Sequence, residues 1–363
     1  MTSQKLRQER LERARTLTSK FYLDEEQYAL SLENIFARSW QFVGNTSQVF
    51  GTDTVAPLTL LEGSLNEPLV LTKQGDGINC LSNVCTHRGS ILIDKSCSQP
   101  SLRCRYHGRR FMLDGTYQSA PGFEGAEDFP SERDNLPVAP MGIWGNLIFA
   151  GVKPEISLDQ LIGEMKERLD FLPLEEFRFA PELSRDYFIK ANWALYVENY
   201  LEGLHVPFIH PSLVSLLDTK AYHTDIHEYC NVQIGVAARA EDSFELPPGH
   251  PDHGQLIAAY YYWLFPNMMF NFYPWGLSIN IVMPQSFNTT KIRFLTYVWR
   301  EERFGSYSVK DINQTEMEDE EVVEMVQRGI RSRFYDTGRY SPTWENGVYQ
   351  FHNLIKSFMH NSI

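Results

Sequence analysis

The sequence predicts an α+β protein of two domains, a small all-β domain followed by a larger domain with an antiparallel sheet and a long C-terminal helix. The chain has 363 residues, which is more than one hydrophobic core ordinarily holds. Residues 40–153 are short β-type runs separated by Gly, Pro, Asn and Asp. Helical and strand-like segments alternate beyond them. We therefore expect an N-terminal helical arm at residues 1–38, a β domain at 39–155 and the larger domain at 156–363.

Composition excludes several classes of protein. Hydrophobic residues make up 43% of the chain and charged residues 22%, as in water-soluble globular proteins. The net charge of −13, without a long basic tract, argues against binding to nucleic acid. Five cysteines are too few, and odd in number, for a disulfide framework. The sequence has no apolar run of the roughly 18 residues that a membrane span needs and no apolar signal-peptide core, so we expect a cytoplasmic protein without membrane contact.

The first domain contains recognisable strands. The stretch "PLVLTKQGDGINCLSNV" predicts a hairpin that turns at residues 74–77, and "IWGNLIFAGV" predicts one further strand. A helix is expected next, at residues 157–172, with Ser157 as its N-cap. Its apolar stripe consists of Leu158, Leu161, Ile162, Met165 and Leu169.

The second domain is predicted to contain both helices and strands. Residues 177–190 are strand-like, and "NWALYVENYLEGLH" at 192–205 is helical. Strands are expected in "AAYYYWLFPNMMFNFY", "LSINIVMPQ" and "IRFLTYVWR". A long helix from about residue 313 to 334 comes last and is expected to cover the sheet.

Two short Cys/His pairs lie in the first domain. They are Cys85-x-His87 and Cys104-x-x-His107, with 16 residues between them. Zinc is one metal that two Cys and two His could bind, but zinc fingers group Cys with Cys and His with His. One Cys and one His in each pair suit a [2Fe–2S] cluster with two thiolates on one iron and two neutral imidazoles on the other.

The residues around these pairs resemble the Rieske motif. That family commonly has Cys-x-His-Arg-Gly and Cys-x-Tyr-His-Gly, which match residues 85–89 and 104–108 here. The resemblance implies that Cys85, His87, Cys104 and His107 bind the cluster. Two residues depart from the motif, Arg105 where Pro is usual and Arg109 where Trp is usual. Neither is a ligand position, so we expect them to affect packing or a partner surface.

A second metal site is predicted in "ENYLEGLHVPFIHPSL". His205 and His210 are five residues apart, and we expect Pro207 to end the helix so that His210 turns back toward His205. Glu198 and Glu202 share a helical face with His205. Two His with one carboxylate form the facial triad of non-heme Fe(II) oxygenases.

The third ligand is expected from the last predicted helix. The candidates are Glu316, Glu318, Asp319, Glu320 and Glu321. At about 100° per residue, the apolar stripe is formed by Val322, Val323, Val326 and Ile330. Asp319 projects into the middle of this stripe and Glu316 borders it, whereas the other three project outside it. A carboxylate directed at a core needs a partner or a metal, so the phase of the helix favours Asp319.

With these motifs, the resemblance extends over nearly the whole chain. "ENYLEGLHVPFIHPS" and "MEDEEVVEMVQRGIRSRFYDTGRYSPTWENGVYQFH" resemble the catalytic α subunit of Rieske non-heme iron oxygenases, nearest the branch with choline and carnitine monooxygenases. The resemblance implies a helix-grip (Bet v1-like) catalytic domain with iron on His205, His210 and Asp319. It also implies a head-to-tail homotrimer in which the cluster of one subunit faces the iron of the next. Glu202 occupies the position of a carboxylate, usually Asp, that links the two metal centres.

The expected function is that of a terminal oxygenase component, an oxidoreductase acting on paired donors with incorporation of O₂. It would hydroxylate or oxidatively N-dealkylate a small molecule, with a quaternary amine of choline, carnitine or betaine type favoured and aromatic ring dihydroxylation as the alternative. The chain has no G-x-G-x-x-G fingerprint, so NAD(P)H and flavin are expected on a partner reductase, with or without a ferredoxin. An electron-transfer Rieske protein with a binding domain is the alternative from another class, but it has no use for His205, His210 and Asp319 together.

Overall fold

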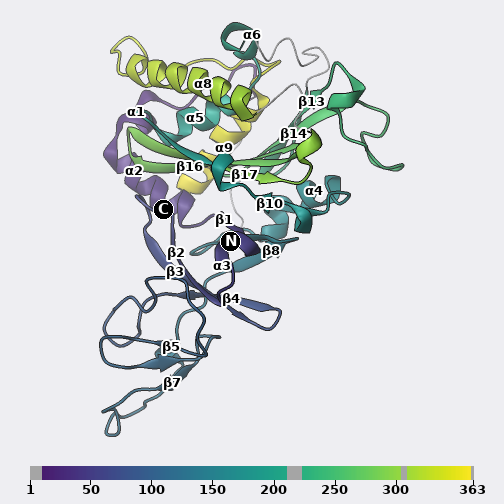
Figure 1. Ribbon diagram of the computed structural model, residues 1–363. Coiled ribbons are helices and arrows are strands. Elements are labelled where there is room, and N and C mark those ends of the chain that lie inside the picture. The colour runs from purple at the N-terminus through teal and green to yellow at the C-terminus, as the bar shows by residue number, and fades with distance from the viewer. Residues whose placement is uncertain (1–9, 211–222, 304–308, 361–363) are drawn as a thin grey trace. The chain divides into compact units, whose positions relative to one another are not determined.

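The structure, a computed structural model, describes residues 10–210, 223–303 and 309–360. The chain forms two compact units (Figure 1). One consists of Met1–Phe36 with Ile156–Ile363, and the other is Ala37–Glu155. The first nine residues of the expected arm lie outside the described residues, and its later part belongs to the larger unit.

The smaller unit contains three antiparallel sheets of three strands each. Their strand orders are β1-β9-β8, β2-β3-β4 and β5-β6-β7. The strands are β1 Gln41–Asn45, β2 Val55–Leu60, β3 Glu67–Gln74, β4 Gly77–Ser82, β5 Leu102–Arg103, β6 Arg110–Phe111, β7 Tyr117–Ser119, β8 Met141–Trp144 and β9 Leu147–Ala150, with one short helix, α3 Thr46–Phe50. The predominance of strands agrees with the sequence prediction.

One predicted strand of this unit is in fact a hairpin. The hairpin expected at residues 74–77 is present, since Gln74 pairs with Gly77 across a two-residue turn. "IWGNLIFAGV", predicted as one strand, instead spans the β8–β9 hairpin, in which Trp144 pairs with Leu147. Gly145 adopts φ +56° in that turn, a left-handed conformation that glycine accepts without steric cost.

The larger unit is built around one antiparallel sheet of eight strands. Seven follow the order β10-β17-β16-β15-β14-β13-β12, and β11 pairs with a further stretch of β17. The strands are β10 Arg178–Phe179, β11 Arg185–Ile189, β12 His223–Ile226, β13 Cys230–Val236, β14 Ile257–Leu264, β15 Met268–Tyr273, β16 Gly276–Ser286 and β17 Thr289–Val298. Every residue of β15 is buried, which explains the nearly continuous run of apolar residues at this point of the sequence.

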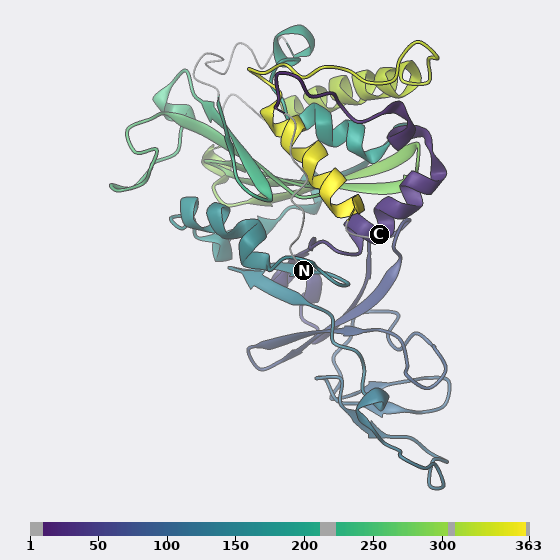
Figure 2. The same cartoon turned by 180° about the vertical axis from the view of Figure 1, so that it is seen from behind.

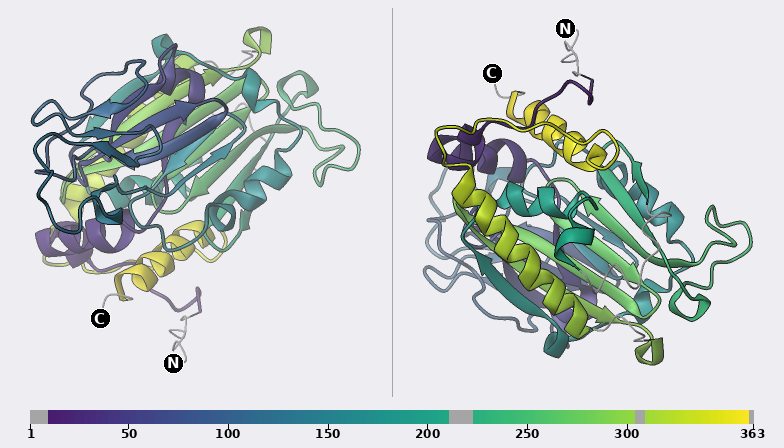
Figure 3. Two further views of the ribbon diagram at one scale, coloured as in Figure 1. Left: turned by 90° about the horizontal axis from the view of Figure 1, so that it is seen from below. Right: turned by 90° about the horizontal axis from the view of Figure 1, so that it is seen from above.

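Helices cover one face of this sheet. Viewed from above, α5 lies between α8 and α9, and the sheet lies behind all three (Figure 3). From behind, α9 and α5 are again seen together above the strands (Figure 2). The helices of the unit are α1 Ser19–Leu23, α2 Glu25–Ser31, a π-helical turn at Leu32–Phe36, α4 Leu158–Arg168, α5 Trp193–Tyr200, α6 Val206–Ile209, α8 Val309–Gly329 and α9 Asn346–His360. None of the helices in the described residues is long and apolar enough to cross a membrane.

The N-terminal segment packs into the larger unit. Phe36 meets Trp193 of α5 edge to face, with 4.8 Å between the ring centroids. The α4 helix begins where the sequence predicts, since Ser157 is its N-cap and forms a capping box with Gln160. Its end at Arg168 comes earlier than the expected residue 172.

Three predictions about the other helices need correction. The helix expected to run to His205 ends at Tyr200, with Leu201 as its C-cap. Pro207 does not end a helix but lies in the first turn of α6, where its missing N–H has no intrahelical role. The long helix is α8, which begins before the expected position and ends at Gly329, and it is followed by α9, which was not predicted.

The buried face of α8 also differs from the predicted stripe. Val323 and Ile330 are buried as expected, but Val326 is 41% exposed. Glu316 and Gln327, both polar, are buried instead. The face is therefore rotated toward Glu316, and Asp319 lies at its edge rather than in its middle. The prediction from apolar residues alone placed the buried face wrongly. Glu316 and Gln327 can be buried because they have tertiary partners, which a sequence does not reveal.

Candidate functional site

The two Cys/His pairs of the smaller unit lie on two loops of matching construction. In each loop the glycine four residues after the cysteine donates its backbone N–H to the cysteine carbonyl oxygen at 3.0 Å, from Gly89 to Cys85 and from Gly108 to Cys104. Both glycines adopt a left-handed backbone, with φ +70° and +76°. That conformation explains why each pair is followed by glycine.

The four candidate ligands of the cluster lie together at these loops. Cys85 and Cys104 are buried, and their thiols are within hydrogen-bonding contact of each other. The rings of His87 and His107 are 4.8 Å apart, centroid to centroid. Two thiols side by side and two imidazoles side by side are the donor set of a cluster with two thiolates on one iron and two imidazoles on the other.

The two thiols differ in their electrostatic surroundings. Burial raises the pKa of the Cys85 thiol above its usual value. Burial also acts on Cys104, but backbone N–H groups of Tyr106 and His107 point at its sulfur and lower its pKa below the usual value. N–H groups directed at sulfur stabilise thiolate, the form that binds iron.

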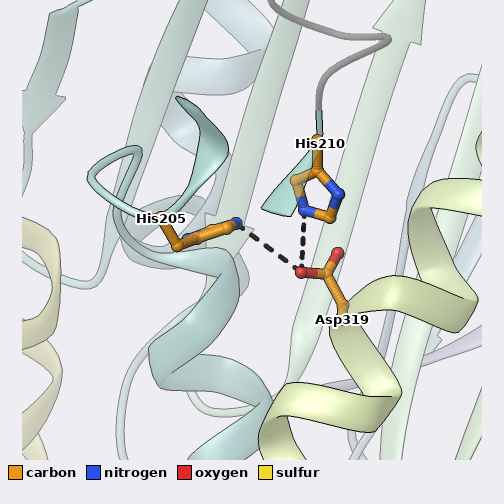
Figure 4. Close-up of side chains that lie close together, drawn as sticks. All are labelled: His205, His210 and Asp319. Atoms are coloured by element: carbon orange, nitrogen blue, oxygen red, sulfur yellow. Dashed lines mark hydrogen bonds and ion pairs between the residues drawn. The ribbon is translucent and has the colours of Figure 1, made fainter. Parts of the chain in front are cut away.

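The candidate iron site lies in the larger unit, where His205, His210 and Asp319 converge (Figure 4). One possible ligand atom from each of the three lies within 4.8 Å of the others. Asp319 Oδ1 is 3.0 Å from His210 Nε2 and 3.6 Å from His205 Nε2. His205 is the N-cap of α6 and His210 its C-cap, so this four-residue helix sets the separation of the two imidazoles.

A second carboxylate holds each imidazole by its other nitrogen. His205 Nδ1 is 2.6 Å from Glu202 Oε1, and His210 Nδ1 is 2.8 Å from Glu318 Oε2. A carboxylate accepts a hydrogen bond from the Nδ1–H group and so leaves the lone pair on Nε2, the atom that faces Asp319. Both histidines are therefore held in the tautomer that binds a metal through Nε2, and the residues fit an Fe(II) ion.

Glu202 is fixed within its own loop. Besides contacting His205, its carboxylate accepts hydrogen bonds from the backbone N–H groups of Leu204 and His205. Glu198, which the sequence placed on the same helical face, lies in a different network. It accepts a hydrogen bond from Tyr22 at 2.7 Å, and His352 Nε2 is 3.0 Å from the same oxygen.

A cavity opens directly at the three candidate iron ligands. Its volume is about 170 Å³, and the lining includes Glu202, His205, His210 and Asp319. Aromatic side chains from α5, the sheet and the turn before α9 line part of its wall, namely Tyr196, Tyr200, Tyr261, Tyr273, Phe294 and Trp344.

One buried carboxyl group also lines this cavity. Glu316 Oε2 accepts a hydrogen bond from Tyr196 at 2.7 Å, while Oε1 has no hydrogen-bond partner among the described residues. Burial raises the pKa of Glu316 well above its usual value. A buried carboxyl oxygen without a partner marks a position where a ligand group can bind.

Sequence reasoning missed Glu318 and gave Glu316 too little weight. It placed Glu318 on the solvated side of the helix, yet Glu318 reaches His210, the C-cap residue of α6. The sequence signal that could have identified Glu318 is its position directly before Asp319, because a residue beside a candidate metal ligand can contact a neighbouring ligand. Glu316 bordered the predicted stripe, and only the tertiary contact with Tyr196 explains its burial.

Two parts of the chain match known protein families. Residues 39–130 match the Rieske [2Fe-2S] domain. Residues 174–361, more than half of the chain, match the family described as ring hydroxylating alpha subunit (catalytic domain). The chain belongs to this family of oxygenases. It is therefore a Rieske-type oxidoreductase that joins a [2Fe–2S] domain to the catalytic domain of mononuclear-iron oxygenases.

Individual relatives of this oxygenase cover nearly its full length. The chloroplastic choline monooxygenase of Arabidopsis thaliana is 30% identical over 95% of this chain and 83% of its own. The carnitine monooxygenase oxygenase subunit of Escherichia coli (strain K12) is 27% identical over 94% of this chain and 92% of its own. The oxygenase is thus homologous to both kinds of enzyme, and a purely electron-transferring protein is excluded as its family.

Solved structures show the same fold. A quaternary ammonium Rieske monooxygenase in complex with L-carnitine matches with a TM-score of 0.75 at 23% identity over 96% of each chain. Naphthalene 1,2-dioxygenase from Rhodococcus sp. matches with a TM-score of 0.73 at 17% identity over 95% of each chain. Two proteins with different substrates therefore share the architecture of this oxygenase, and the substrate has to be argued from the cavity.

Proposed function

We propose that this protein is a terminal oxygenase that hydroxylates a small quaternary ammonium compound of choline, carnitine or betaine type. The observation that carries the proposal is an aromatic cavity with a buried carboxyl group, which opens at His205, His210 and Asp319. When the hydroxylated carbon is attached to nitrogen, the product loses that carbon as an aldehyde. The reaction then becomes an N-dealkylation.

The lining of the cavity supports a cationic substrate. Tyr261, Tyr273 and Phe294 line the cavity, and aromatic rings are the groups that attract a quaternary ammonium, which forms no hydrogen bonds. The unpartnered oxygen of Glu316 supplies a negative charge when a cation lies beside it. A flat hydrocarbon offers this carboxyl group neither a charge nor a hydrogen bond, and an uncompensated buried polar group costs about 1–3 kcal/mol.

We assign the iron ligands to His205, His210 and Asp319, and the cluster ligands to Cys85, His87, Cys104 and His107. Bound iron would supply the site at which O₂ is activated. The chain's own residues orient the ligands, hold the substrate against the site and limit the access of water. Cluster binding is assigned to residues 39–155 and catalysis to residues 156–363. Within the expected arm at residues 1–38, residues 10–36 belong to the same compact unit as the catalytic residues.

Rieske oxygenases work with reductase or ferredoxin partners and form oligomers. For this chain we propose an NAD(P)H-dependent flavin reductase as the electron source, a head-to-tail homotrimer and a cytoplasmic location. Two electrons from the reductase and two protons balance the insertion of one oxygen atom into a C–H bond and the release of the other as water. Glu202 is proposed to link the cluster of one subunit to the iron of the next through His205, which it contacts.

The proposed substrate class can be tested by coupled O₂ uptake. Full-length protein with both iron centres reconstituted is given a reductase, NADH and either choline, carnitine, glycine betaine or benzoate. We expect a quaternary amine to support uptake with stoichiometric product. Coupled uptake with benzoate alone would instead establish an aromatic oxygenase. Failure of every quaternary amine, with both centres intact, would refute the proposal.

Glu316→Gln tests the recognition of the cation. We expect the KM for the ammonium substrate to rise about tenfold, because a charged contact of about 1.5 kcal/mol is lost. A neutral carbon analogue of the same substrate is the matched control, and its KM should not change. Equal effects on both compounds would mean that Glu316 only supports the cavity wall.

Glu202→Gln tests the proposed link between subunits. Gln keeps an acceptor oxygen for the loop but loses the charge. We expect both centres to be retained and the cluster still to be reduced by the reductase, while its reoxidation with substrate and O₂ slows by orders of magnitude in stopped flow. Normal reoxidation in an iron-replete variant would show that Glu202 only orients His205.

A further inference from the structure

Arg109 lies directly beside the candidate cluster ligands, at a position where the Rieske motif usually has Trp. Its side chain is only 3% exposed, so it belongs to the interior and not to a partner surface. Three aromatic rings surround the guanidinium, those of Tyr117, Phe123 and Phe129, with their centroids 5.1 to 5.3 Å from Arg109 Cζ. A permanent positive charge is thus held in an aromatic box within the cluster-binding unit.

Arg109 also joins the two ligand loops. Its backbone carbonyl oxygen accepts a hydrogen bond from the N–H of Cys104 at 2.8 Å. Its Nη1 donates to Thr86 Oγ1 at 2.8 Å, and Thr86 stands between Cys85 and His87. One residue therefore contacts the second loop through its backbone and the first loop through its side chain.

The aromatic box reaches the ligands as well. The ring of Phe123 is 5.2 Å from the Arg109 guanidinium and also 5.2 Å from the ring of His87, centroid to centroid. Phe123 therefore contacts both the guanidinium and the half-buried imidazole of His87. Because Arg109 itself is buried, water screens its charge less than that of an exposed side chain.

The counter-charge of Arg109 is more exposed to water than the guanidinium. Arg109 Nη2 pairs with Asp134 Oδ1 at 3.2 Å, but the side chain of Asp134 is 19% exposed and thus better screened by water, so it offsets the positive charge only in part. The other oxygen of Asp134 accepts hydrogen bonds from the backbone N–H and hydroxyl of Ser131. The positive end of the pair contacts the Thr86 side chain between the ligands.

We propose that Arg109 raises the reduction potential of the Rieske cluster by placing a buried positive charge against both ligand loops. Reduction adds one electron to the cluster, supplied by the reductase. A nearby positive charge stabilises the more negative reduced state, so the potential is higher than with a neutral side chain at this position. Arg109 is a positioning residue and does not bind the cluster itself.

The test is a redox titration of the full-length holoenzyme, followed by the EPR signal of the reduced cluster. Arg109→Met removes the charge at similar volume, and we expect its potential to shift downward. Arg109→Lys keeps the charge but not the planar fork, and its potential should lie between those of Met and wild type. Asp134→Asn removes the counter-charge and should shift the potential upward.

Opposite shifts in Arg109→Met and Asp134→Asn separate a charge effect from a structural one. Loosening of the loops would change iron and sulfide content in both variants without opposite shifts. An unchanged potential in Arg109→Met, or shifts of both variants in the same direction, would overturn the proposal. Should Arg109→Met not retain a cluster, an unchanged or lowered potential in Asp134→Asn would overturn it equally.

The inference rests on the proposed cluster ligands, which are tested independently. Cys104→Ala should lose the visible absorption and the Rieske EPR signal. Retention of that signal would refute the ligand assignment, whatever the Arg109 variants show. Loss of the signal together with an unmoved potential in Arg109→Met would refute only the role of Arg109.

Discussion

At the scale of single residues, neighbouring carboxylates of one helix have different tasks. Asp319 meets both imidazoles through one oxygen, while Glu318 contacts the far side of His210. Glu321, two residues beyond Asp319, is exposed to solvent. These three positions provide substitutions of similar chemistry whose effects on iron should differ.

Asp319→Ala should remove the mononuclear iron alone. The wild-type chain is expected to hold about three iron atoms, two in the cluster and one at the triad. We expect about two in Asp319→Ala, with an unchanged Rieske EPR signal, because the cluster ligands belong to the other unit. Glu321→Ala is the matched control and should retain all the iron. Equal iron content in the two variants would disprove the choice of ligand.

Glu318→Gln should weaken iron binding without removing a ligand. Loss of the carboxylate at His210 Nδ1 makes the imidazole less basic and frees its orientation. We expect the affinity for Fe(II) to fall about 10- to 100-fold in competition with a chelator. Glu321→Gln, which removes a carboxylate from the solvated side of the same helix, should leave the affinity unchanged. An unaltered affinity in Glu318→Gln would mean that this contact does not support the metal.

At the scale of elements, α8 presents a face to the core that its apolar residues alone do not identify. Val323 is 2% exposed and Val326 is 41% exposed, although both were part of the predicted stripe. The same substitution three residues apart therefore measures the position of the buried face.

Val323→Ala should destabilise the larger unit by about 2 kcal/mol, because two buried methyl groups are lost and a cavity remains. Val326→Ala should change stability by less than about 0.5 kcal/mol, since its side chain is largely in water. Chemical denaturation of the two variants, followed by far-UV circular dichroism, provides the comparison. A larger loss for Val326→Ala would contradict the observed face.

At the scale of the whole molecule, the proposed trimer makes the two metal centres of one chain serve different partners. Cys104→Ala is expected to lack the cluster but keep the iron site, and Asp319→Ala is expected to have the reverse defect. Each variant alone should be inactive. Inactivity of each is expected whether electrons pass within a chain or between chains, so a mixture of the two is needed.

Co-expression of the two variants with different tags, followed by isolation of mixed trimers, should restore activity. In every mixed trimer, about a third of the head-to-tail contacts join an intact cluster to an intact iron site. We expect substrate-coupled O₂ uptake near that fraction of the wild-type rate. Absence of activity in mixed trimers that contain both centres would refute transfer between subunits.

The sequence by itself determined what local spacing can encode. It predicted the β-rich unit and the helix that begins after Ser157, and it singled out the Cys/His pairs together with His205, His210 and Asp319. Each of these signals lies within about 25 residues or in one helical period. The Cys and His residues among them are also scarce, with five Cys and ten His in the chain, so their spacing stands out.

Only the tertiary structure decided how distant segments meet. The burial of Glu316 and the contact of Glu318 with His210 depend on partners 120 and 108 residues away in the sequence. The enclosure of Arg109 depends on aromatic rings and an acidic group that no spacing pattern indicates. Sequence analysis predicts that a polar side chain is exposed to solvent, because its burial without a partner is unfavourable. The partner is known only from the folded structure. For that reason the sequence identified the candidate ligands, whereas the structure revealed the residues that hold and tune them.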